Sequence, residues 1–299
     1  MAFTIQYAMA WQLKSLQILP KLCLGHSLGE LVSATISNVI SLEESYAMIK
    51  ARAHLFEQYG RGAMILVPMT QEALITFDLS SVSIAGLNGP DRVMLSGSKD
   101  CIADIKKVID AYLKPLGKKT LYFSDDYAFH SKALRFGIDE FLATLNRFHF
   151  KAPTLPIFSS FMIESVQEMD ASYWVEQIQK PVYFYQSIEK INLKHPSAIF
   201  IDFSPDSQLS VILTRNGVSP ERVISIFLAG ADTTEPYEQT LATLWENRII
   251  HCLPIKKTTS TKALMLPTYS FNRTKCWVEP DLIPIEAPTV VEKKMPFYF

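Results

Sequence analysis

A serine between two glycines, at the end of a short apolar segment, is the feature that most restricts how this chain can fold. Residues 21–25 predict a short buried strand, and residues 27–37 predict a helix. Gly-x-Ser-x-Gly between a strand and a helix is typical of a nucleophile elbow, a tight turn that exposes the serine. Glycine on either side permits the close backbone approach that such a turn needs. The pattern therefore predicts an α/β body built around Ser27.

The same turn supplies a way to stabilise negative charge. A helix that begins directly after Ser27 leaves its first N–H groups without partners. The backbone N–H of Leu28 can therefore stabilise an oxyanion. The alternative is a glycine-rich turn whose serine has no chemical role.

A nucleophilic serine needs a base, and histidine is the usual one. The chain offers six histidines: His26, His54, His130, His149, His195 and His251. His26 is expected to point away from the serine as a packing residue, and the histidines near helix ends and strand starts are expected on the surface. His130 lies in a loop where a small subdomain rejoins the body, and catalytic groups collect in such loops. We therefore predict His130 as the base.

The subdomain is predicted from the order of elements in residues 61–124. Strands at 62–69, 82–87, 92–96 and 118–123 alternate with helices at 70–76 and 99–113. This β-α-β-β-α-β order is that of a ferredoxin-like unit. We expect it to be inserted into an α/β-hydrolase-like body formed by residues 1–60 and 125–250, with residues 251–299 as an extended linker.

The remaining body elements follow from apolar periodicity. Helices are expected at 3–17, 42–58, 131–147, 173–193 with a break near Pro181, and 234–247, and strands at 198–203 and 223–227. Ser41 and Glu44 form a capping box at the start of the second of these helices.

Composition excludes several function classes. The net charge is −1 and no run of Lys or Arg occurs, so composition gives no support for nucleic-acid or membrane-surface binding. No apolar run reaches the ~18–20 residues of a membrane span. The four cysteines (Cys23, Cys101, Cys252 and Cys276) lack metal-site spacing, and the first residues lack a basic secretion leader. A cytoplasmic protein without a bound metal is expected.

Five motifs together resemble one family. They are GHSLGE (25–30), LNGPDRVMLSG (87–97), YAFHS (127–131), YWVEQIQKPVYF (173–184) and LPTYSFNRTKCW (266–277). They resemble, in order, segments of the acyltransferase domains of modular polyketide synthases and of malonyl-CoA:acyl-carrier-protein transacylases. The resemblance implies the same α/β-hydrolase-like body with a ferredoxin-like subdomain.

The resemblance also implies roles for particular residues. Ser27 would take an acyl group from coenzyme A as an ester, and His130 would deprotonate it. Arg52 matches the family arginine that binds the free carboxylate of the extender unit, which a planar guanidinium can hold through two hydrogen bonds. Without the family match, Arg52 would be interpreted as an exposed helix charge, and Arg61 would be an equal candidate.

Further substrate-binding residues are expected beside these three: Leu28, Phe129, Tyr127, His26 and Asn88. Bulky Phe129 would crowd an α-methyl group, so malonyl is favoured over methylmalonyl. One methyl group is worth only about 1–3 kcal/mol, so this single residue leaves methylmalonyl open as the alternative.

The implied reaction is a ping-pong transfer in polyketide or fatty acid synthesis. A malonyl-type unit passes from coenzyme A to Ser27 and then to the phosphopantetheine thiol of an acyl carrier protein. No bound cofactor is expected. The expected partners are malonyl-CoA or a related acyl-CoA, the carrier protein, and neighbouring synthase domains such as a ketosynthase.

Three departures from the family pattern accompany the resemblance. A Gly-Gln-Gly loop that supplies a second oxyanion N–H does not precede Phe3, so an N-terminally truncated domain is expected; losing one such donor costs about 10²–10³ in rate. The family's Gly-Pro-Gly is Ser204-Pro205-Asp206, and position 183 is Tyr183. These differences leave open which group orients His130.

Two alternatives remain from the sequence. One is a serine esterase of the α/β-hydrolase type, in which Asp232 and His251 would complete a Ser…Asp…His order. The other is an inactive, truncated synthase module.

Overall fold

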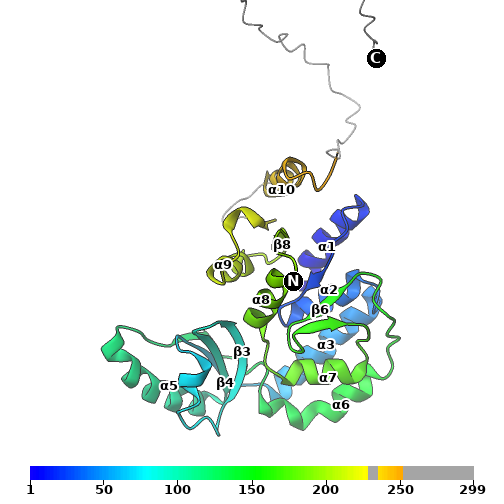
Figure 1. Cartoon of the computed structure of the whole chain (residues 1–299). Helices are drawn as coiled ribbons and strands as arrows, with labels where there is room; N and C mark the ends of the chain where they lie inside the picture. Colours follow the sequence, from blue (N-terminus) through cyan, green and yellow to red (C-terminus); the bar gives the residue numbers. More distant parts are fainter. Residues whose placement is uncertain (228–234, 252–299) are drawn as a thin grey trace, which may run out of the picture. The chain divides into compact units, whose positions relative to one another are not determined.

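The computed structural model describes residues 1–227 and 235–251 (Figure 1). In this part of the chain the strands form three sheets. The linker predicted at 251–299 lies, apart from His251, outside the described residues. The boundaries predicted for the body and the subdomain stay predictions.

The first sheet contains the strand that leads to Ser27. It consists of β1 (Cys23–Leu24), β6 (Ile157–Ser159) and β7 (Glu164–Val166), in the order β1-β6-β7. Strands β1 and β6 are parallel, with Cys23 opposite Ile157, and β6 and β7 are antiparallel. Neither β6 nor β7 was among the predicted strands.

Helices from distant parts of the sequence pack around this sheet. They are α1 (Ala2–Ser15), α2 (Leu28–Ile36), α3 (Leu42–Tyr59), α6 (Ile138–Leu145) and α7 (Ala171–Gln179). The capping box predicted for α3 is present: the Ser41 hydroxyl accepts from the Glu44 N–H, and the Glu44 carboxylate accepts from the Ser41 N–H. The helix predicted at 131–147 is instead a 3₁₀ helix, η2 (Lys132–Gly137), followed by α6.

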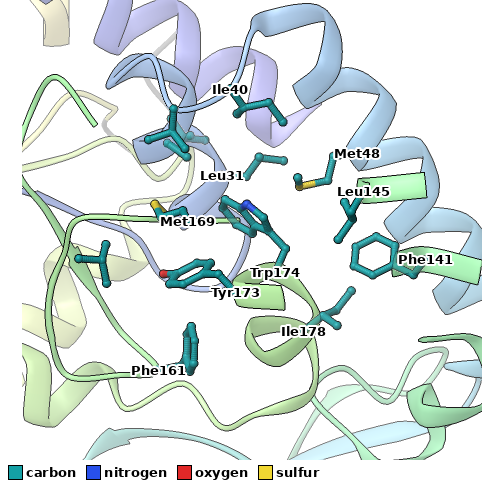
Figure 2. Close-up of a cluster of buried hydrophobic side chains, with 14 of the residues drawn as sticks. Leu31, Ile40, Met48, Phe141, Leu145, Phe161, Met169, Tyr173, Trp174 and Ile178 are labelled. Carbon is teal, nitrogen blue, oxygen red and sulfur yellow. The ribbon is translucent and has the colours of Figure 1, made fainter. Parts of the chain in front are cut away.

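Trp174 lies at the centre of the largest group of buried apolar side chains. Its indole is 1% exposed and packs with Leu31 of α2 and Met48 of α3 (Figure 2). Leu145 of α6 and Ile178 of α7 belong to the same cluster. This core fixes the three helices α2, α3 and α7 against one another, and all three carry residues of the candidate site.

The second sheet is built from the inserted segment. Its strands β2 (Ala63–Val67), β3 (Ser83–Gly89), β4 (Arg92–Gly97) and β5 (Leu121–Ser124) pair antiparallel in the order β3-β4-β2-β5. With α4 (Gln71–Leu74) after β2, and with α5 (Lys99–Leu113) and the short 3₁₀ helix η1 (Lys114–Leu116) between β4 and β5, this is the predicted β-α-β-β-α-β arrangement. Helix α5 lies along one face of the sheet (Figure 1).

Strand β3 connects this sheet to the segment that follows α7. The Leu87 N–H donates to the Val182 carbonyl at 2.8 Å, and the Val182 N–H donates to the Ala85 carbonyl at 3.0 Å. The chain around Pro181 is thereby held by the inserted sheet.

A third, two-stranded parallel sheet consists of β8 (Phe200–Asp202) and β9 (Val223–Ser225). The neighbouring helices are α8 (Phe184–Lys194), α9 (Gln208–Arg215), the 3₁₀ helix η3 (Pro220–Arg222) and α10 (Glu235–Glu246). The predicted break near Pro181 is therefore the boundary between α7 and α8.

Candidate active site

Ser27 occupies a strained turn between β1 and α2. Its φ of 52° and ψ of −105° lie outside the regions that non-glycine residues usually adopt. A side chain at Gly25 would put its Cβ 2.1 Å from the Glu30 nitrogen, so the turn requires glycine there. Gly29 differs, because a Cβ at that position meets nothing within 4 Å. The expectation that both glycines serve close backbone approach is therefore wrong for Gly29.

His130 lies within hydrogen-bond distance of this serine. Its Nε2 is 2.7 Å from the Ser27 Oγ, and its Nδ1 is 3.0 Å from the carbonyl oxygen of Lys180. A carbonyl oxygen can only accept, so Nδ1 carries the proton in the neutral ring. The lone pair of Nε2 is then free to accept the Ser27 hydroxyl proton.

The surroundings keep this imidazole neutral. Burial, then the positive charge of Arg52 and then His26, lower the pKa of His130 from its usual 6.5 to about 3, while the bond to the Lys180 carbonyl acts in the opposite direction. A neutral ring at physiological pH is the form that a general base requires.

Arg52 is buried, contrary to its interpretation from the sequence alone as an exposed helix charge. It is 6% exposed on α3, and within the described chain Gln177 is its hydrogen-bond partner, with Nη1 donating to Oε1 at 3.4 Å. Burial lowers the pKa of Arg52 to about 10, and the charge of Glu30 opposes this effect. Arg61 is half-exposed and forms an ion pair with Glu57. The structure thus separates the two arginines by burial.

Gln177 connects the serine turn to Arg52. Its Nε2 donates to the Ser27 carbonyl at 2.9 Å, while its Oε1 accepts from Arg52. Gln177 is 1% exposed, and it lies one turn before Lys180, whose carbonyl accepts from His130. The end of α7 therefore contacts the serine turn, the guanidinium and the imidazole.

Glu30 lies beneath the turn and is fully buried. One carboxylate oxygen accepts from the Ser160 N–H at 2.6 Å and the Ser160 hydroxyl at 2.8 Å, and the other accepts from the Tyr173 hydroxyl at 3.0 Å. Burial raises the pKa of Glu30, and its hydrogen bonds and the charge of Arg52 oppose that rise. This carboxylate joins α2 to β6 and α7.

His26 turns toward the inserted sheet. Its Nε2–H donates to the Asn88 side-chain oxygen at 2.9 Å, and its ring packs edge-on against Phe184 with centroids 4.9 Å apart. Two of the predicted substrate residues, His26 and Asn88, are therefore brought together. Burial lowers the pKa of His26.

Tyr127 and Phe129 pack beside each other but face different partners. The Tyr127 hydroxyl donates to the Glu57 carboxylate at 2.7 Å, in an environment shared with Arg61. The Phe129 ring lies edge-on to Phe56, with centroids 4.7 Å apart, and Phe56 in turn lies 6.0 Å from the Arg52 guanidinium carbon. Phe56 therefore lies between Phe129 and Arg52, whereas the Tyr127 hydroxyl is bound to Glu57.

The Leu28 N–H, at the first residue of α2, makes no hydrogen bond to any described residue. Among the described residues, no cluster of His, Cys, Asp and Glu has the arrangement of a metal site. No helix in the described ranges is long and apolar enough to cross a bilayer.

Of the two alternative partners of Ser27, the structure describes one, His251. The Ser27 hydroxyl lies 2.7 Å from His130, whereas His251 is exposed. Asp232 lies outside the described residues.

Three residues at this site were missed by the sequence reasoning: Glu30, Gln177 and Lys180. For Lys180 the sequence contained a signal: Pro181 ends the helix, so the last carbonyls of the helix lack intrahelical partners and can accept hydrogen bonds from other side chains. Tyr173 and Gln177, four residues apart, also predict a shared helix face.

Comparisons with known proteins identify the family. Residues 2–245 match the model of the family described as "Acyl transferase domain". The polyketide synthase GfsA of Streptomyces halstedii is 25% identical over 93% of this chain and 4% of its own length. The non-reducing polyketide synthase pks12 of Talaromyces marneffei is 27% identical over 97% of this chain and 17% of its own length. The chain thus spans only a small part of these relatives.

Solved structures show the same fold. The acyltransferase domain from the second module of the salinomycin polyketide synthase has a TM-score of 0.74 and 28% identity, over 81% of this chain and 58% of that one. The malonyl CoA-acyl carrier protein transacylase of Clostridium perfringens has a TM-score of 0.71 over 83% of this chain and 78% of that one, and at 22% identity it shows the fold alone. The α/β-hydrolase-like body with a ferredoxin-like subdomain is confirmed. With its family match over most of its length, the chain belongs to the acyl transferase domain family.

Proposed function

We propose that this chain transfers a malonyl-type acyl group from coenzyme A to the phosphopantetheine thiol of an acyl carrier protein, through an ester on Ser27. The observation that carries the proposal is the 2.7 Å contact between the Ser27 Oγ and the Nε2 of a His130 whose other nitrogen is bound to a carbonyl. This arrangement is that of a nucleophile with an oriented base.

In the first half-reaction, Nε2 of His130 takes the Ser27 proton as Oγ attacks the thioester carbonyl. The Leu28 N–H stabilises the resulting oxyanion. The C–S bond then breaks, the protonated His130 returns the proton to the coenzyme A sulfur, and the acyl ester remains on Ser27. In the second half-reaction, His130 takes the proton of the carrier's thiol as its sulfur attacks the ester carbonyl. The bond between the acyl carbon and Oγ then breaks, and His130 returns the proton to Ser27.

Arg52 supports selection of a substrate with a free carboxylate. Its guanidinium is buried with one long hydrogen bond to a neutral amide, so a carboxylate would add the charge-assisted bonds it lacks. An acetyl group offers no such partner and would leave the guanidinium with Gln177 as its hydrogen-bond partner among the described residues.

Intact-protein mass spectrometry after incubation with malonyl-CoA tests the proposal. The native chain should gain one malonyl group, whereas S27A should gain none and H130A should be acylated about 10³–10⁴-fold more slowly. A native chain that is never acylated, or an S27A chain that is acylated normally, would contradict it.

Substrate choice is tested by exchanging the arginines separately. R52A should lower acylation by malonyl-CoA about 10²-fold and reduce the preference over acetyl-CoA, because a buried charged partner is lost. R61A is the matched control and should change neither rate, since Arg61 binds Glu57 at the surface. Equal effects of the two substitutions would exclude Arg52 as the carboxylate ligand.

A further inference from the structure

Strand β5 is an exposed edge of the four-stranded sheet. It pairs with β2 on one side, and no other described strand pairs with its outer side. Its three consecutive apolar residues are all exposed: Leu121 by 51%, Tyr122 by 55% and Phe123 by 60%. An edge with unpaired backbone groups and exposed apolar side chains is a template for pairing with another strand.

The charges that flank this strand are arranged symmetrically about Tyr122. The segment reads Lys-Lys-Thr-Leu-Tyr-Phe-Ser-Asp-Asp from 118 to 126. Two lysines precede the strand and two aspartates follow it. Thr120 and Ser124 lie between these charges and the three apolar residues. Two copies of the segment that run antiparallel therefore place basic side chains opposite acidic ones, hydroxyl residues opposite hydroxyl residues, and apolar residues opposite apolar residues.

We propose that β5 pairs antiparallel with β5 of a second copy of this chain, in the register that places Tyr122 opposite Tyr122. Two-fold symmetry then generates every contact twice. Leu121 lies opposite Phe123 of the second copy, and Lys119 lies opposite its Asp125. Pairs of this kind, apolar with aromatic and basic with acidic, are the ones that stabilise antiparallel strands.

Two observations favour this occupant and register. Lys119 and Asp125 form no ion pair within the described chain, so both charges are available; Lys118 already lies 4.0 Å from Asp91. Lys119 and Asp125 flank β5 at equal distances from Tyr122, just outside its bounds of Leu121–Ser124; the strand itself has an irregularity at Phe123, because Tyr122 lies opposite Ile65 and Ser124 opposite Met64. A shift of one residue would place Leu121 opposite Tyr122 or Ser124 instead of Phe123, and the pairing would no longer be symmetric about Tyr122. The contact is short, so the dimer should be weak and concentration-dependent. The inference does not depend on the proposed function.

Sedimentation velocity of the full chain over a range of concentrations tests the pairing. The native chain should shift from monomer to dimer as concentration rises. K119D places a carboxylate opposite Asp125 of the second copy in both symmetric positions, and D125K places two ammonium groups opposite each other. Each substitution should weaken dimerisation roughly tenfold.

The two single variants mixed in equal amounts should associate as strongly as the native chain, because each would then face the opposite charge. K119D/D125K should likewise regain self-association. K107D is the control, since it reverses a charge on the exposed face of α5 beside Asp104, and it should leave the dimer unchanged.

A native chain that stays monomeric at all concentrations overturns the proposal. A dimer that K119D and D125K leave intact, or a mixture that associates no better than either variant alone, also overturns it. Circular dichroism spectra that match the native spectrum verify that the variants are folded.

Discussion

Gly25 lies so close to the backbone of the following helix that no side chain fits there. The strained φ of Ser27 depends on this approach, because the chain must reverse within the turn before α2 begins. The backbone thus fixes the position of the serine in the turn, and the 2.7 Å contact with His130 orients its hydroxyl.

Replacing the two glycines separately should give opposite results. G25A should abolish acylation and destabilise the fold by several kcal/mol, since its Cβ would overlap the Glu30 backbone. G29A should be tolerated and stabilise the chain by about 0.4–1 kcal/mol, because its Cβ meets open space and alanine restricts the unfolded chain. Denaturant unfolding measures both, and a G25A chain as stable as the native one would refute this account of the turn.

Burial of His130 makes stability depend on pH. The folded-state pKa is about 3 against a usual 6.5, so below about pH 6.5 the unfolded chain binds a proton that the folded chain does not. The free energy of unfolding should therefore be fully retained above pH 6.5 and fall as the pH drops toward 3, and His26 contributes in the same direction.

Unfolding curves at pH 7 and pH 5 measure this dependence. H130Q should lose less stability between the two values than the native chain does. H54Q removes a histidine that is 56% exposed and should keep the native dependence. The same loss in all three proteins would show that His130 does not contribute.

Helix α7 is the element on which the candidate site depends most. One face of it carries Tyr173 and Gln177, and its end carries the Lys180 carbonyl. Glu30 fixes this helix to α2 and, through Ser160, to β6. One buried carboxylate thus connects the helix that follows the nucleophile to the helix whose end accepts a hydrogen bond from the base.

Removal of that carboxylate should destabilise the protein. E30A leaves the Ser160 N–H and the Tyr173 hydroxyl buried without a partner, and each unsatisfied group costs about 1–3 kcal/mol. E30Q should cost less, because the amide can still accept from Ser160. E176Q, at a half-exposed position on α7, should stay within about 0.5 kcal/mol of the native chain in denaturant unfolding. An E30A protein as stable as E176Q would remove the role assigned to Glu30.

The elements with strong local signals could be predicted from the sequence. Helix α3 has a capping box, and the inserted sheet has turn residues between its strands, so both were predicted near their observed bounds. Strands β6 and β7 have three residues each, too few to show a period, and only their pairing with β1 and with each other defines them. The Ser27–His130 contact was anticipated from motifs, whereas Glu30 and Gln177 depend on contacts across more than 100 residues, which local patterns do not contain.

At the scale of the whole molecule, the site is assembled from four separated segments. Ser27 follows β1, Arg52 lies on α3, His130 follows β5, and Gln177 lies on α7. Phe129 lies where the inserted sheet meets α3, since it packs against the cluster of Met64, Ala85 and Met94 in that sheet and against Phe56 of α3. The size of the acyl group accepted should therefore depend on this junction.

F129A should increase the rate with methylmalonyl-CoA relative to malonyl-CoA by about tenfold, because space for one methyl group is worth about 1–3 kcal/mol. Y127F is the matched control. It removes only the hydroxyl that Glu57 holds, so the ratio should not change. Competition between the two thioesters, followed by mass spectrometry of the acylated chain, measures the ratio; an F129A chain with the native ratio would place the selectivity elsewhere.

The partner of the His130 Nδ1 is a main-chain oxygen, and the side chain of the same residue, Lys180, points to Glu176. Exchange of residue 180 for another amino acid would therefore leave the acceptor atom in place. A systematic scan of side chains would record this position as neutral, although the imidazole depends on it. Only an alteration of the polypeptide itself, such as an insertion that moves Pro181, would reveal what this atom contributes.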